Sequence, residues 1–129
     1  MLLLASLWAA ASSLQVQAQE PAKGGTRVSP GGTTRVYVMA AFDKDCQSLA
    51  KPAIIVTAPP AKGQVSFREG PTIVVQQSLS GQCLGTRVTG TGIYYTASPG
   101  STGVDSFSIT ATLATGEVAQ RTFQLKIED

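Results

Sequence analysis

The polar residues limit the chemistry open to this 129-residue chain, because it contains two cysteines, eight carboxylates and no histidine. Ser-His-Asp and Cys-His catalysis both use an imidazole as the general base, so neither can be built here in its usual form. Zinc sites with histidine ligands are excluded for the same reason. A Ser–Lys pair is the remaining nucleophilic arrangement, but the lysines fall in predicted turns rather than in an apolar pocket that would activate them. We therefore expect that the chain is not an enzyme and needs no cofactor.

Paired carboxylates could still act as general acid and base or bind a metal ion. Five acids fall at predicted turns or strand edges, where water solvates them: Asp43, Asp45, Glu69, Asp105 and Glu117. Asp43 and Asp45 offer alternating carboxylates to a calcium ion, but no full loop of oxygen ligands follows them. We interpret this segment as a polar turn, with calcium binding as the alternative.

The two cysteines, Cys46 and Cys83, allow one intramolecular pairing. They lack the C-x-x-C spacing and the partner histidine of a redox or metal site, so we predict a structural disulfide between two loops. Closing a loop of about 38 residues would stabilise the fold by roughly 4 kcal/mol in the chain-entropy model. That is a large share of the roughly 5–15 kcal/mol by which a domain is stable.

A disulfide persists in oxidising compartments, and the first eighteen residues indicate export to one. Residues 1–11 are an apolar run, shorter than the roughly 20 residues with which a helix crosses a bilayer. Val16 and Ala18 then place small side chains three and one residues before a boundary, which is typical of a signal peptide. We predict that residues 1–18 are a signal peptide and that the protein is periplasmic or extracellular, with no membrane span in the mature chain. A buried N-terminal helix is the alternative.

The remainder of the chain, about 110 residues, is enough for one domain with a single core. Its ten lysines and arginines are scattered and the formal net charge is +2, so it lacks the dense basic stripe of a nucleic-acid-binding protein. Residues 19–33 are rich in glycine, proline and small polar side chains, and we predict a flexible leader there. The folded domain is predicted over residues 34–129.

From Thr34 onward most segments show patterns that favour β-strands rather than helices. Four segments in the first half are β-branched or alternate with a period of two: 35–39, 53–57, 64–68 and 72–76. Segment 53–57 is continuously apolar, which favours a strand covered on both faces. In segment 64–68, Val65 and Phe67 should point inward.

The last third of the chain has the clearest pattern. Residues 106–113 and 122–128 alternate strictly and are joined by a predicted turn at 114–117, so they should form an antiparallel hairpin with one face in the core. The core side chains expected from this hairpin are Phe107, Ile109, Phe123, Leu125 and Ile127. Glycine and proline interrupt the rest of the chain at short intervals. The sequence therefore predicts an all-β fold, an antiparallel β-sandwich of about seven strands.

Three segments carry a resemblance to a known family. Residues 60–65 read PAKGQV, residues 92–100 read GIYYTASPG and residues 101–107 read STGVDSF. They resemble the P-x-x-G-x-V, Y-T-P-x-P-G and G-x-D-S-F segments of bacterial Ig-like and cadherin-like repeat domains, with Ala97 where the family usually has proline. The resemblance runs from about residue 53 to 127. It implies an Ig-like β-sandwich used for adhesion, spacing or protein binding.

The last of these segments contains a strand-entrance motif, formed by Gly103, Asp105 and Phe107. Gly103 permits a tight turn with positive φ, Asp105 can accept hydrogen bonds from backbone amides, and Phe107 begins the inward-facing row. Tyr94 and Tyr95 are neighbours on one predicted strand, so one should enter the core while the other faces solvent.

Export, the absence of histidine and the repeat-like segments lead us to expect a small non-catalytic binding or structural module. It would act through surface contacts with a protein or surface polymer of the envelope or extracellular space. The alternative is an exported inhibitor or accessory subunit of a hydrolase. Such a protein would insert a disulfide-linked loop, Asp43–Leu49 or Ser80–Arg87, into its partner's cleft.

Overall fold

A computed structural model of the chain describes residues 25–78 and 81–129. These residues form seven β-strands, so the all-β prediction is confirmed. The strands are β1 (Thr26–Val28), β2 (Thr33–Met39), β3 (Ala53–Ala58), β4 (Gly63–Val74), β5 (Arg87–Ala97), β6 (Gly103–Thr112) and β7 (Val118–Ile127). Within the described ranges, no helix is long and apolar enough to cross a membrane.

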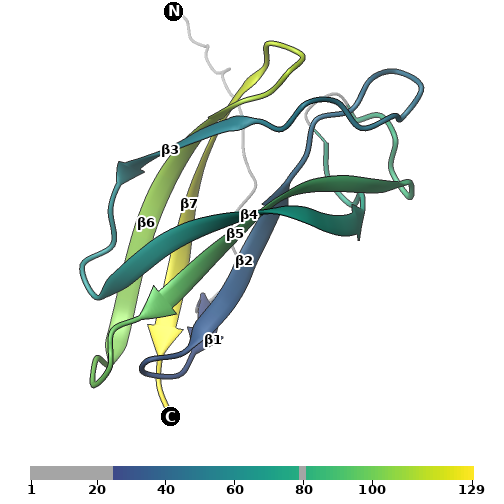
Figure 1. The fold of residues 1–129 in the computed structure, drawn as a ribbon. Helices are drawn as coiled ribbons and strands as arrows, with labels where there is room; N and C mark the ends of the chain where they lie inside the picture. Colours follow the sequence, from purple (N-terminus) through teal and green to yellow (C-terminus); the bar gives the residue numbers. More distant parts are fainter. Residues whose placement is uncertain (1–24, 79–80) are drawn as a thin grey trace, which may run out of the picture.

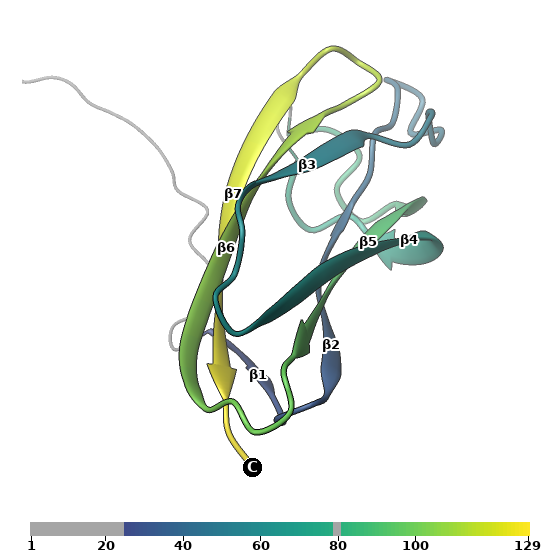
Figure 2. The same cartoon turned by 60° about the vertical axis from the view of Figure 1, so that its left-hand side comes forward.

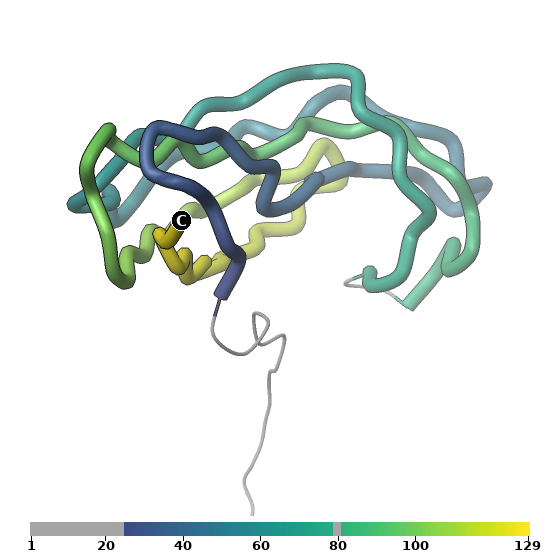
Figure 3. Tube along the Cα trace, turned by 90° about the horizontal axis from the view of Figure 1, so that it is seen from below, coloured from purple at the N-terminus to yellow at the C-terminus, as the bar shows by residue number. Residues whose placement is uncertain are grey.

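The strands form the two sheets of a β-sandwich (Figures 1 and 2). One sheet has four strands in the order β1-β7-β6-β3, and the other has three in the order β2-β5-β4. Neighbouring strands are antiparallel, except that the short β1 runs parallel to β7. Figure 3 shows the two layers from below, with the yellow β7 under the layer that contains β2, β4 and β5.

Alternating side chains of β5, β6 and β7 fill the space between the sheets. The five core residues predicted from the C-terminal hairpin are all buried, and β6 and β7 pair in register over their full length. In the facing sheet Tyr95 is fully buried and its ring stacks on Phe107, with 6.2 Å between the centroids. Its neighbour Tyr94 points to the other face and is half-buried beneath the Arg68 guanidinium, 4.7 Å from the ring centroid.

Strand β3 differs from the prediction that both of its faces are covered. It is the edge strand of the four-stranded sheet and pairs only with β6. Ile54 packs against the core, whereas Ile55 is 62% exposed. An apolar run predicts a strand correctly, but it does not state whether a second layer lies on each face.

Strand β4 joins two segments that we predicted as separate. Gly70 and Pro71 do not break the strand, because they form an irregularity between Glu69 and Thr72, after which pairing with β5 resumes. As predicted, Phe67 is on the core-facing side of β4, since it is in register with the fully buried Ile93, but 38% of this residue is exposed. Strand β4 is also an edge strand, so Phe67 lies at the open margin of the sandwich.

The folded part begins before residue 34, inside the segment predicted as a flexible leader. Strand β1 pairs with Leu125–Ile127, and Val28 is buried in the core. Arg27 adds a surface ion pair with Glu128 at 3.1 Å. Composition does not reveal that the end of β7 supplies backbone partners for this segment. The predicted signal peptide, residues 1–18, and residues 19–24 lie outside the described residues.

Candidate functional site

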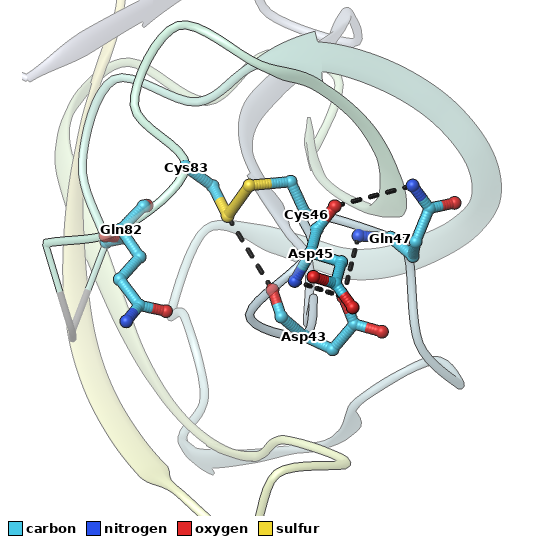
Figure 4. Close-up of a disulfide and its surroundings, with 7 residues drawn as sticks. Asp43, Asp45, Cys46, Gln47, Gln82 and Cys83 are labelled. Carbon is cyan, nitrogen blue, oxygen red and sulfur yellow. Dashed lines mark hydrogen bonds between the residues drawn. A yellow bond between two sulfur atoms is a disulfide. The ribbon is translucent and has the colours of Figure 1, made fainter.

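The predicted disulfide is present and joins two loops at one end of the sandwich (Figure 4). Cys46 lies between β2 and β3, Cys83 lies between β4 and β5, and their Cα atoms are 5.5 Å apart. Both residues have positive φ, 63° and 65°, a conformation that non-glycine residues seldom adopt. The bond therefore connects two irregular loops rather than two strands.

The Asp43 carboxylate is used within its own turn, as Figure 4 shows. Its Oδ1 atom accepts hydrogen bonds from the backbone N–H groups of Asp45 at 2.9 Å and Gln47 at 3.0 Å. Cys83 Sγ lies 3.7 Å from the Asp43 carbonyl oxygen, which is a simple contact because a disulfide sulfur carries no proton. No cluster of three or more metal-ligating side chains occurs in residues 25–78 and 81–129. The geometry thus fits the polar turn.

Ser48 and Lys51 have the S-x-x-K spacing of hydrolases that use a Ser–Lys pair, a match that our sequence-based argument against such a pair overlooked. This spacing brings lysine to serine in a helix, where residues three apart are neighbours, and residues 48–51 are not helical. The Ser48 hydroxyl instead accepts a hydrogen bond from the Thr89 backbone N–H at 3.2 Å. Ser48 and Lys51 are both exposed. The pair is not arranged for nucleophilic attack.

Asp105 lies at the opposite end of the sandwich and accepts four hydrogen bonds. Its Oδ1 atom accepts from the backbone N–H groups of Ala61 at 3.0 Å and Ser106 at 2.9 Å. Its Oδ2 atom accepts from the backbone N–H of Lys62 at 2.8 Å and from the Tyr95 hydroxyl at 2.7 Å. We call these five residues the Asp105 cluster. It links β6, the β3–β4 turn and β5, and so connects the two sheets.

The burial of Asp105 corrects our expectation of a solvated acid at a strand edge, because only 6% of the residue is exposed. Burial alone would raise the pKa of the carboxyl group, but the hydrogen bonds from Tyr95 and three backbone amides favour the charged form and hold the pKa below its ordinary value. Burial and the adjacent carboxylate raise the pKa of Tyr95, so the phenol keeps its proton. In the cluster Asp105 therefore stays charged and Tyr95 stays protonated, which suits a structural role.

A glycine allows Tyr95 to reach Asp105. A Cβ atom on Gly63 would overlap the backbone oxygen of Thr96 and would lie 2.6 Å from Tyr95 Cζ and 2.7 Å from its hydroxyl oxygen, so no larger side chain fits without a shift of the backbone as well as the ring. Gly103 opens β6 with φ of 96°, and Phe107 is buried two residues after the aspartate. The three segments that carry the family resemblance thus meet at the Asp105 cluster.

A groove of about 780 Å³ lies at the disulfide end, lined by β2, the end of β4 and the β6–β7 hairpin. Its volume falls within the roughly 300–1,000 Å³ of ligand pockets. Among its lining residues are the buried side chains Val38, Met39, Val75, Val88 and Leu113. The base of the groove is therefore apolar.

Three arginines also line this groove: Arg35 from β2, Arg87 from β5 and Arg121 from β7. Within the described part of the chain, none of them takes part in a salt bridge. The one acid of the lining, Glu117, accepts a hydrogen bond from the Thr115 hydroxyl at 2.8 Å. The sequence shows these arginines as scattered, because only the topology brings them to one groove. We call this feature the arginine groove.

Comparison of the chain with protein families, with curated proteins and with solved structures returned no match.

Proposed function

We propose that the chain is a small, exported, non-catalytic binding module of Ig-like type that contacts a partner of the envelope or extracellular space. The arginine groove is the observation that carries this proposal. It combines an apolar base, positive charge without an ion-pair partner among the described residues, and a size suited to a ligand. These features favour contact with a second molecule rather than a purely structural role.

Export and Ig-like character are supported by separate observations. The Cys46–Cys83 disulfide fits an oxidising compartment, and the apolar run with its cleavage-like boundary fits a secretory signal. The segments that resemble bacterial Ig-like and cadherin-like repeats converge on one structural cluster, as expected if they maintain a common sandwich. Ig-like membership remains part of the proposal.

A non-catalytic role is supported by how the reactive groups are used. Asp105 is saturated with hydrogen bonds, and the Ser48 hydroxyl accepts from the Thr89 backbone N–H in a segment that is not helical. We expect no turnover by the purified chain on peptide, ester, glycoside or phosphoester panels. A reproducible rate that is lost in Lys51→Ala would contradict this part of the proposal.

Affinity capture tests the binding role directly. The immobilised oxidised chain would be exposed to periplasmic extract and culture medium, beside the variant Arg35→Gln/Arg87→Gln/Arg121→Gln. The proposal expects an envelope protein or surface polymer on the wild-type resin and little of it on the variant. Equal retention by both resins would show that the groove does not carry binding. A hydrolase on the wild-type resin would favour the second candidate.

The second candidate is an inhibitor or accessory subunit of a hydrolase, and the disulfide-linked loops favour it. Leu49 and Leu84 are 36% and 57% exposed, one on each loop. The Asp43–Leu49 loop is held by the Asp43 turn and by a hydrogen bond from the Leu49 N–H to the Ala41 carbonyl at 2.8 Å. A rigid loop with exposed apolar side chains suits insertion into a cleft. Leu84→Ser would abolish retention of a hydrolase and leave binding in the arginine groove unchanged.

A further inference from the structure

We propose that the arginine groove binds an extended acidic segment of a partner protein, which adds as a strand along the free edge of β2. Its carboxylates would contact Arg35, Arg87 and Arg121. This inference rests on the proposed binding function and specifies the chemistry of the ligand.

The first argument is the free strand edge beside the groove. Strand β2 is the outer strand of its sheet, and among the described strands it pairs only with β5 (Figure 1). In the four-stranded sheet β1 pairs only with Leu125–Ile127 of β7. The same edge of residues 118–124 of β7 therefore has no partner strand among the described residues. Residues of both margins line the groove, including Arg35, Tyr37 and Ala119. An open edge of this kind offers backbone groups that recognise an extended peptide.

The second argument is the apolar base of the groove. An extended peptide presents side chains alternately to its two sides. Along the β2 edge one set of these side chains would face Met39 and Leu113, while the other set would face solvent. A segment that alternates apolar and polar residues would therefore bury its apolar set.

The third argument is the separation of the charges. Arg35 is in register with Tyr94, and Arg87 lies seven residues before Tyr94 on β5. At about 3.3 Å per residue, the two arginines are about 23 Å apart along the sheet. This is well beyond the roughly 8 Å over which salt screens charges at physiological ionic strength. A lipid or fatty acid with one anionic end would contact the arginines at only one end of the groove. A peptide with acidic residues at both of its ends would contact arginines along the whole groove.

The test uses the purified, oxidised chain and a defined synthetic peptide. The probe has nine residues, with two glutamates at each end and alternating valine and threonine between them. Titration calorimetry in about 50 mM salt gives Kd, and amide chemical shifts of the labelled chain give the binding surface. We expect shifts along β2 and β7, and an affinity that weakens as salt rises. Replacement of Arg35, Arg87 and Arg121 by glutamine should raise Kd about tenfold, since each exposed pair contributes a factor of about two.

Control proteins and ligands separate the elements of the proposal. The charge-matched variant Arg27→Gln/Lys44→Gln/Arg68→Gln changes residues outside the groove and should bind the probe like the wild type. A glutamine version of the probe should bind about tenfold more weakly. A version in which both the valines and the threonines are N-methylated keeps the charges but blocks backbone donation from either edge, so it should lose most of its affinity. Dodecanoate presents an anion and an apolar chain without a peptide backbone, and should bind weakly.

The outcomes distinguish this inference from the proposed function. Binding of dodecanoate with the same arginine dependence, and no binding of the peptide, would overturn the peptide proposal in favour of an anionic amphiphile. Unchanged affinity of the N-methylated probe would refute strand addition. If the probe fails while affinity capture still retains a partner on the wild-type resin, the binding function holds and the acidic-strand inference falls. Failure of both would remove the binding function itself.

Discussion

Asp105→Asn should lower the free energy of unfolding by about 4 kcal/mol. The carboxylate accepts from the backbone N–H groups of Ala61, Lys62 and Ser106 and from the Tyr95 hydroxyl, two donors on each oxygen. Asparagine keeps one acceptor oxygen and turns an NH₂ group toward the other two donors. Hydrogen bonds to charged groups contribute about 1.5–3 kcal/mol each, so the loss of two gives an effect of this size.

Urea unfolding at pH 7, followed by far-ultraviolet circular dichroism, measures this effect. Tyr95→Phe removes one of the four donors and should cost about 2 kcal/mol. The matched control is Asp45→Asn, an exposed acid in the disulfide loop, which should change stability by less than about 0.5 kcal/mol. A loss of less than 1 kcal/mol for Asp105→Asn would refute the view that this carboxylate holds the two sheets together.

Because the pKa of Asp105 is lowered in the folded state, its contribution to the free energy of unfolding depends on pH. The pKa of this carboxyl group is lower in the folded state than its ordinary value of 3.8, so the unfolded state takes up the proton first as pH falls. The stabilisation is therefore complete above about pH 5 and is lost as pH decreases through the folded pKa. The stability gap between wild type and Asp105→Asn should narrow from pH 7 toward pH 2. A gap that stays constant over this range would show that ionisation of Asp105 is not its source.

Three further changes test other parts of the fold. Cys46→Ser should cost about 4 kcal/mol, and the wild-type chain should gain no mass on thiol alkylation until it is reduced. Gly63→Ala should cost about 1–3 kcal/mol because the new Cβ atom overlaps the Thr96 backbone oxygen and the Tyr95 ring, and a neutral result would show that both can move away freely. Ile109→Val in the core should cost about 1 kcal/mol, whereas Ile55→Val on the exposed face of β3 should have almost no effect. Equal losses at the two isoleucines would mean that β3 is covered in solution.

The C-terminal hairpin could be predicted because one local rule determines it. Strict alternation in β6 and β7 assigns each side chain to a face, and the four-residue turn between the segments sets their pairing. Phe107, Phe123 and Leu125 are accordingly buried as predicted. No other part of the chain is needed to derive this result.

Strands β1, β3 and β4 were harder to predict because their surroundings come from remote segments. The burial of Val28 depends on the end of β7, a hundred residues away in the chain. Ile55 is exposed because no described strand covers the outer face of β3, and Phe67 is partly exposed because β4 is an edge strand. Local pattern identifies a strand but cannot state its place in the sheet order.

The Asp105 cluster and the arginine groove were even harder to predict from local sequence. The sequence indicates that Asp105 caps backbone amides, but not that its donors come from residues 61, 62 and 95, on two other elements. The arginine groove leaves no local signal, because its arginines are separated by tens of residues. Both features exist only once the two sheets face each other.

In our proposal the Asp105 cluster at one end of the sandwich stabilises the fold, whereas the arginine groove binds a partner. At one end Asp105, Tyr95 and Gly63 fit so closely that a change at any of them should destabilise the fold. In the arginine groove Arg35 and Arg87 are exposed, and neither is in an ion pair with a described residue, so their replacement should cost the fold little. A variant that loses its partner without losing stability therefore reports on the groove, whereas a change in the Asp105 cluster that lowers both reports on the fold. This separation makes the binding proposal testable by substitution.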